Sequence, residues 1–284
     1  MQLGKSVIIH DAPAFSEYLL MSDVHFDNPK CDRALLKRHL DEAKRRNAKI
    51  LINGDFFCVM QGLSDKRHTK GDLMERHKGP NYFDLIIEDA CEFFAPYAEN
   101  LLMVGYGNHE TAVLKRGEHD MIANFIYRMK YEHKADIQQG GYGGWVVIRS
   151  SMAGNRFSTK IKYYHGSGGG GPVTKGVIAN QRMMAMVQGA DVIWMGHVHE
   201  LYHHLDMVES IDSFQGRYFV KHNEVHHVRT AGYKEEYQDG TGGFHVERGR
   251  PPKPLGSYWM TIEVHQRGGR KVGHSKSITF TMAR

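Results

Sequence analysis

The first half of the chain alternates short apolar runs with amphipathic stretches, and this alternation constrains the fold more than any other feature. Apolar runs at 18–25, 49–57 and 100–110 predict strands, whereas 32–48 and 82–100 place apolar side chains at helical spacing. Strand–helix–strand units give parallel strands whose carboxyl ends share one edge of a sheet. We therefore expect an α/β protein whose ligand-binding residues gather at that edge.

From about residue 144 the pattern changes to mostly β-structure. Strand patterns occupy much of 144–165. Residues 174–190 predict a helix, and a strand and turn follow at 191–200. Further β-segments are expected at 217–233, 257–266 and 277–283. This layout predicts two mixed sheets packed face to face with flanking helices. We expect a single domain over 1–284, with a polar loop or lid at 61–80 and a Gly/Pro-rich excursion at 235–256.

Composition excludes several classes of protein. Lys and Arg (37) exceed Asp and Glu (32), and the net charge of +5 admits anionic partners without the strongly basic footprint of many nucleic-acid binders. The three cysteines form no C-x-x-C pair, which disfavours a disulfide framework. With no long apolar run, we expect a cytoplasmic protein without a membrane partner, whose oligomeric state the sequence leaves open. The 19 histidines raise metal binding as a question.

Five short polar motifs follow strand-like runs, in this order along the chain: Asp23-Val-His25, Gly54-Asp55, Gly107-Asn108-His109-Glu110, Tyr164-His165-Gly166 and Gly196-His197-Val-His199. Each motif alone is compatible with an ordinary polar strand end. Together they bring Asp, Asn and His to turns held by rigid strands, and neighbouring glycines allow backbone and ion to approach closely. The set therefore predicts a metal site.

The five motifs resemble those of the calcineurin-like metallophosphoesterases, D-x-H, G-D, G-N-H-[DE], H and G-H-x-H, over residues 18–200. The resemblance implies a four-layer αββα sandwich and two divalent metal ions. Mn²⁺ is the favoured metal, and Fe, Zn, Ni, Co or Mg are the alternatives, because mixed nitrogen and oxygen ligands suit such ions. The implied ligands are Asp23, His25, Asp55 and His199 for one ion, and the bridging Asp55 with Asn108, His165 and His197 for the other.

The resemblance also implies a mechanism. An anionic bridge such as Asp55 offsets the repulsion between two neighbouring cations, and a water between them loses a proton easily. The resulting hydroxide attacks phosphorus in line. His109, next to a ligand but not itself one in the family, protonates the leaving oxygen or stabilises its charge.

The chain departs from the family pattern at one point. Many members carry a second carboxylate three residues after the bridging Asp, which orients the catalytic His, and protein phosphatases add an Arg directly after it. Here Cys58 takes the place of the carboxylate and Val59 that of the Arg. This departure disfavours a Ser/Thr phosphoprotein phosphatase and places the chain nearer the phosphodiesterases and nucleases. Asp27 is our candidate for orienting His109.

We therefore predict a phosphodiesterase or nuclease acting on nucleic acid or nucleotides. One alternative is a phosphomonoesterase acting on a nucleotide or phosphoprotein. The other is a non-catalytic binding scaffold of the same fold. The complete ligand set and the retained His109 argue against the scaffold.

Weaker signals concern the substrate phosphate. Gly168 and Gly169 belong to a glycine-rich stretch after His165 that predicts either a phosphate cradle or a flexible connector. Lys115 and Arg116 are candidates for contacting a substrate phosphate, although solvated charges at a helix start explain them somewhat better. Further along, a second group of histidines is interpreted as lying on a sheet surface: His203, His204, His222, His226 and His227.

Overall fold

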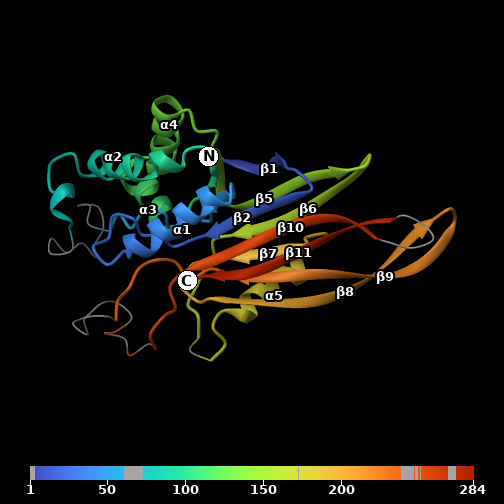
Figure 1. Ribbon diagram of the computed structural model, residues 1–284. Coiled ribbons are helices and arrows are strands. Elements are labelled where there is room, and N and C mark those ends of the chain that lie inside the picture. The colour runs from blue at the N-terminus through green and yellow to red at the C-terminus, as the bar shows by residue number, and fades with distance from the viewer. Residues whose placement is uncertain are drawn as a thin grey trace.

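The computed structural model describes residues 4–60, 73–171, 173–237, 246, 249, 251–267 and 273–284. It is a mixed α/β protein in which helices gather at one end of a long curved sheet (Figure 1). The strands follow the order β11-β10-β2-β3-β4-β5-β6-β7-β9-β8, and β1 pairs with β5 outside this path.

The elements have the following bounds. The strands are β1 (Lys5–Asp11), β2 (Phe15–Met21), β3 (Lys49–Ile52), β4 (Leu101–Val104), β5 (Gln138–Met152), β6 (Asn155–Tyr164), β7 (Val192–Met195), β8 (Tyr202–Phe214), β9 (Arg217–Arg229), β10 (Ser257–Arg267) and β11 (Gly273–Ala283). The helices are α1 (Arg33–Arg45), α2 (Tyr82–Phe94), α3 (Asn108–Gly117), α4 (Met121–His133) and α5 (Val177–Met186), with short 3-10 turns η2 (Glu75–His77) and η3 (Ala95–Tyr97).

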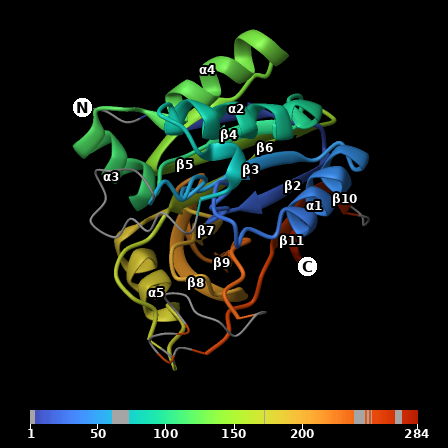
Figure 2. The same cartoon turned by 90° about the vertical axis from the view of Figure 1, so that its left-hand side faces the viewer.

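Strand alternation divides the interior into two cores. Along β2, Leu19 and Met21 pack into a core shared with α1, α2 and α4, whereas Tyr18 and Leu20 face a second core. The second core also takes Ile161 of β6 and residues of β5, β7 and β10. The sheet therefore wraps around the second core, and α2 and α4 lie on the opposite side from α5 (Figure 2).

The expected α/β class is confirmed, including the parallel pairing of β2, β3 and β4. The expected pair of separate sheets is not confirmed. The first residues of the long strand β5 pair with β4, and Gly143–Met152 pair with β6. Because β5 hydrogen-bonds on both sides, the strands form one continuous path.

Two of the expected segments lie partly outside the described residues. The predicted loop 61–80 is described only from residue 73, where η2 begins two residues later; residues 61–72 and most of 238–250 lie outside the described residues. The predicted lid, excursion and single-domain boundary thus remain predictions. In the part of the chain that is described, no helix has the length and apolar character needed to cross a bilayer.

Candidate metal centre

The five sequence motifs meet at one edge of the sheet. The parallel strands β2, β3 and β4 lead into Asp23, Asp55 and Asn108, and the parallel pair β6 and β7 leads into His165 and His197. Asn108 is the first residue of α3, so the expected turn after β4 is a helix start. Carboxyl ends of parallel strands collect ligands in open α/β sheets, which explains the convergence.

The predicted ligands form two adjacent triads. Asp23, His25 and His199 make one, and Asp55, His165 and His197 make the other; within each triad the donor atoms lie within 4.8 Å of one another. Asn108 joins the second triad, since its Oδ1 lies 3.3 Å from Nε2 of His165. The structure thus brings all seven predicted ligand residues together.

The backbone of the site adopts conformations that side chains rarely take. Five of the seven predicted ligands have positive φ: Asp23 (52°), His25 (49°), Asp55 (47°), His197 (73°) and His199 (53°). Non-glycine residues in this region are uncommon, and such strain concentrates at functional sites. The surrounding hydrogen bonds maintain it: both oxygens of Asp23 accept from the backbone N–H of His197, at 3.0 and 2.9 Å.

Two glycines make room for the carboxylates. A Cβ on Gly107 would overlap the carboxylate of Asp55, and one on Gly196 would lie 2.5 Å from Oδ2 of Asp23. Gly107 has φ in the ordinary negative range, so its requirement is purely steric. The glycines in the motifs are therefore needed for close approach of strand ends to the acidic ligands.

Burial and mutual charge govern protonation in the cluster. Burial raises the pKa of Asp23 to about 6, with a further contribution from the charge of Asp55. Burial also acts on Asp55, but the imidazoles of His165 and His109 outweigh it and hold the pKa of that carboxyl well below its usual range. For His165, burial is outweighed by the charge of Asp55, which raises the pKa to about 9. Asp55 is thus the anionic centre of the site.

The donor set fits divalent cations. Nδ1 of His165 donates to the carbonyl of Asn53 at 2.8 Å, so in the neutral ring Nε2 carries the lone pair. That nitrogen faces Oδ2 of Asp55 at 3.2 Å as well as Asn108. A lone pair surrounded by oxygen acceptors is the arrangement that a cation stabilises. In addition, Nδ1 of His25 and Nδ1 of His197 are buried without a hydrogen-bond partner.

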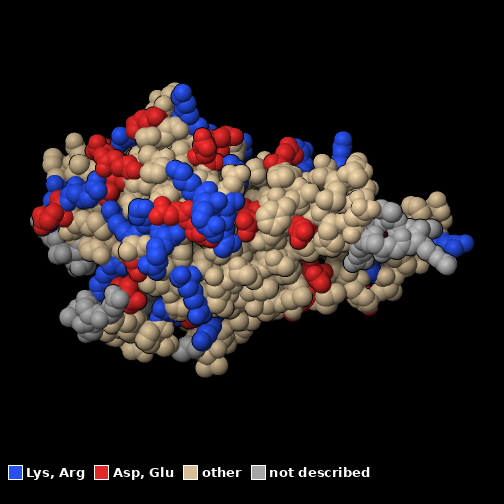
Figure 3. All heavy atoms as spheres, in the orientation of Figure 1, with Lys and Arg blue, Asp and Glu red and all other residues tan. Residues whose placement is uncertain are grey.

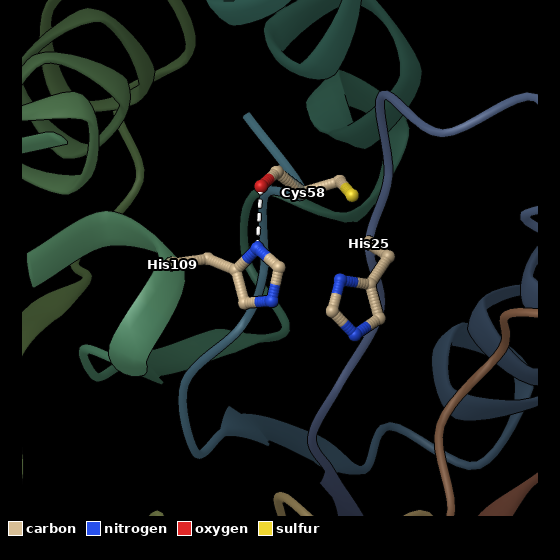
Figure 4. Close-up of side chains that lie close together, drawn as sticks. All are labelled: His25, Cys58 and His109. Atoms are coloured by element: carbon tan, nitrogen blue, oxygen red, sulfur yellow. Dashed lines mark hydrogen bonds between the residues drawn. The ribbon is translucent and has the colours of Figure 1, made fainter. Parts of the chain in front are cut away.

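His109 lies beside both triads. Its Nδ1 lies 2.6 Å from the carbonyl oxygen of Cys58, and its Nε2 lies 3.8 Å from Oδ2 of Asp55. Burial lowers its pKa, but the charge of Asp55 and the Cys58 carbonyl outweigh burial and raise the pKa to about 10. Figure 4 shows its ring beside that of His25, with the Cys58 carbonyl directed at His109 and the thiol turned toward the His25 side.

Asp27 acts on His109 through the backbone. It accepts hydrogen bonds from the N–H groups of Cys58 (2.5 Å) and Val59 (2.9 Å), and it is 3% exposed. It therefore fixes the peptide whose carbonyl holds His109. The sequence named Asp27 as the orienting residue, and the structure gives this indirect route.

A cavity of about 360 Å³ opens over the cluster. Of the residues predicted to bind substrate, Gly168 and Gly169 line it, whereas Lys115 and Arg116 are exposed in the last turn of α3 and do not. The described lining adds Lys234 and Glu236, which pair at 2.6 Å and which the sequence analysis missed. They arrive from the segment after β9, so no motif spacing could have indicated them.

Glu110 is a third missed residue, although it lies inside a motif. Its buried carboxylate accepts from the N–H groups of Asp55, Phe57 and Gly107 at 3.2, 2.8 and 2.8 Å. Burial and the charge of Asp55 raise its pKa to about 7. Glu110 thus ties the turn after β3 to the start of α3. Its position at the third residue of a helix is the sequence signal that could have identified it.

No protein-family model matches the chain, and no curated protein matches it either. Among solved structures it is similar to a conserved protein from Streptococcus pneumoniae described as a predicted phosphoesterase, with 12% identity over 96% of this chain and 92% of that one and a TM-score of 0.35. GAP50, the anchor in the inner membrane complex of Plasmodium, has 10% sequence identity over 95% of this chain and 85% of that one, with a TM-score of 0.44. Vps29 of Chaetomium thermophilum has 6% sequence identity over 94% of this chain and 96% of that one, with a TM-score of 0.31.

The assignment of a candidate metal centre rests on the five motifs and on their convergence, because structural similarity at these TM-scores carries no argument. The motifs follow strand ends in the expected order, and their Asp and His residues form two triads. Both features agree with the resemblance drawn from the sequence. Where the resemblance leads us to expect a carboxylate this chain has Cys58, and the main-chain carbonyl of Cys58 contacts Nδ1 of His109 instead.

Proposed function

We propose that this chain is a dinuclear metal-dependent phosphoesterase that cleaves phosphodiesters in nucleic acid or nucleotides. The observation that carries the proposal is a pair of adjacent ligand triads, one of which contains Asp55, beside His109 and under one cavity. When bound, two divalent cations supply Lewis acidity toward phosphate oxygens and lower the pKa of water.

The residues of the chain divide into three roles. Asp23, His25 and His199 would hold one cation, and Asp55, Asn108, His165 and His197 would hold the other, with Asp55 as the candidate for a shared anionic ligand. His109 keeps its Nδ1–H on the Cys58 carbonyl, so its Nε2 faces the site and can give a proton to the leaving oxygen. Gly168 and Gly169 offer backbone at the cavity wall, where a phosphate or its ester group can lie.

The charge of the cavity favours a diester over a monoester. Among the described lining residues the Lys or Arg side chain is Lys234, and it pairs with Glu236. A dianionic monoester gains most from additional arginine or lysine, whereas a monoanionic diester needs less cationic charge. Figure 3 shows basic and acidic side chains interspersed over the helical end of the face in view. This surface suits a short or locally contacted nucleic acid.

The substrate class is tested with purified, Mn²⁺-loaded protein. We expect faster hydrolysis of bis(p-nitrophenyl) phosphate than of p-nitrophenyl phosphate, and cleavage of at least one of single-stranded DNA, double-stranded DNA or RNA. If the protein hydrolyses bis(p-nitrophenyl) phosphate but cleaves none of the polynucleotides, the substrate class is small nucleotides. Preference for the monoester contradicts the proposed diester specificity.

A further inference from the structure

A second group of potential ligands lies on the β8–β9 hairpin, away from the candidate metal centre. His204 of β8 is paired directly with His227 of β9, and Asp206 lies two residues after His204. Residues two apart on a strand share a face, and directly opposed residues bring their Cβ atoms close together. The three donor atoms lie within 4.8 Å of one another.

The distances describe a compact site. Oδ2 of Asp206 lies 3.1 Å from Nε2 of His227 and 3.8 Å from Nε2 of His204. The two imidazole rings are stacked, with centroids 4.5 Å apart and planes 6° from parallel. Both rings therefore present an edge to the same carboxylate.

His227 gives an independent sign of a missing ligand. The residue is 0% exposed, and neither Nδ1 nor Nε2 has a hydrogen-bond partner. The Asp206 oxygen at 3.1 Å lies outside hydrogen-bond geometry. A buried ring nitrogen without a partner is costly, and coordination of a cation by Nε2, the nitrogen that faces Asp206, removes that cost at this nitrogen. This burial also corrects the interpretation of His226 and His227 as sheet-surface residues, since His226 is only 6% exposed.

Gln181 of α5 completes the group from the opposite side. Its amide Nε2 lies 2.7 Å from Oδ2 of Asp206 and 3.1 Å from Nε2 of His204. Rotation of the amide by half a turn exchanges its nitrogen and oxygen, so that an oxygen donor faces the cluster. Helix α5 and strand β8 lie side by side here (Figures 1 and 2).

We propose that His204, Asp206 and His227 bind a divalent transition-metal ion of the zinc class, with Gln181 as fourth ligand. Two imidazoles with oxygen donors suit Zn²⁺, Co²⁺ or Ni²⁺. The ion fastens α5 to the hairpin. This inference does not depend on the proposed function of the candidate metal centre.

The position of the ion gives it a structural role. Asn180, next to Gln181, accepts from Nη2 of Arg229 at 2.7 Å, and Nη1 of Arg229 donates to the carbonyl of Gly196 at 2.6 Å. Gly196 directly precedes the predicted ligand His197. An ion that holds α5 therefore supports the loop that carries two predicted ligands.

The test is Co²⁺ binding to metal-stripped protein, followed by equilibrium dialysis and visible absorption. The measurement is made in an Asp23→Ala, Asp55→Ala background, which removes the carboxylate from each triad of the candidate metal centre, so that the hairpin site is measured by itself. We expect this background to keep one bound Co²⁺ per chain, which His204→Gln removes. The matched control is His222→Gln, because His222 is an exposed histidine of the same hairpin.

Thermal unfolding provides the second readout. Zn²⁺ should raise the Tm of the parent and of His222→Gln, and the rise should be lost in His204→Gln. If His204→Gln does not fold, Asp206→Asn replaces it, since Asp206 is partly exposed. Equal Co²⁺ binding and equal Tm shifts in the hairpin variants and the control would overturn the proposal.

Discussion

The imidazole of His109 is oriented by the main chain of Cys58, through a contact of 2.6 Å between Nδ1 and the carbonyl oxygen. A carbonyl accepts one proton as a carboxylate does, and so it selects the same tautomer without bringing a second negative charge next to the ring. The charge is placed one peptide further away, on Asp27, which accepts from the N–H groups of Cys58 and Val59. The departure from the family pattern at Cys58 is therefore compatible with a working His109.

Replacing His109 tests its assignment as proton donor. His109→Ala should retain its bound metal, since His109 belongs to neither ligand triad, and should lower kcat by about 10²- to 10⁴-fold. Metal content by mass spectrometry and turnover of a diester are measured on the same sample. Loss of metal together with activity would show that His109 is a ligand instead.

Replacing Cys58 separates its thiol from its carbonyl. Cys58→Ser keeps the carbonyl that holds His109, so we expect kcat to fall by less than about tenfold, below the usual contribution of an acid–base group. The thiol also lies within reach of His25 and His109, which makes it an alternative ligand. If Cys58→Ser instead loses a metal equivalent, the thiol is part of the metal site.

Asp27 is a positioning residue, and its removal should affect His109 more than the metal. In Asp27→Asn one N–H of the Cys58–Val59 pair faces an amide N–H₂ instead of an oxygen, so the carbonyl of Cys58 shifts. We expect lower kcat with unchanged KM and metal content, and a displaced acidic or basic limb in the pH profile. A uniform loss of folded protein, with kcat per folded chain unchanged, would leave Asp27 a purely structural role.

Gly107→Ala should disrupt the site by steric overlap with Asp55. We expect weaker metal binding and loss of turnover, measured by metal titration of stripped protein. The matched control is Gly117→Ala in the same helix, where the added Cβ meets only Val113 Cγ1 at 3.8 Å. Equal metal affinity in the two variants would contradict the packing described for Asp55.

Lys115 and Arg116 lie outside the described cavity lining, so they should affect only substrates long enough to reach them. The Lys115→Ala, Arg116→Ala double variant should raise KM for an oligonucleotide and reduce its salt dependence, while KM for bis(p-nitrophenyl) phosphate stays constant. KM measured for both substrates at several salt concentrations checks this. An equal change for both substrates would place these side chains at the reaction centre.

The sequence indicated where the motifs would gather, whereas the ligand set itself came from the resemblance to a known family. Motifs such as Asp23-Val-His25 are local, and parallel strands bring their carboxyl ends to one edge, so the convergence of the motifs followed from the strand pattern. The continuity of the sheet depends on which strands pair along β5, and side-chain periodicity does not encode that choice. Helix α4 was missed even though Ile122, Phe125 and Met129 recur at helical spacing. Lys234 reaches the cavity only through tertiary structure.

The histidines of β8 and β9 are a second case in which the sequence pattern did not show the tertiary packing. Alternation along β8 and β9 suggested surface positions, because the pattern of two strands does not reveal what packs on them. Helix α5 covers one face, where Gln181 contacts Asp206. On the other face, His226 lies against Phe280 of β11 with ring centroids 5.1 Å apart.

The most direct test of the account is diester hydrolysis by metal-stripped protein before and after addition of Mn²⁺, compared between the wild type and Asp55→Ala. The account predicts no turnover without metal, turnover restored by Mn²⁺ in the wild type, and none in Asp55→Ala at any metal concentration. Absence of hydrolysis with every divalent ion tested, or equal activity in Asp55→Ala, would contradict it.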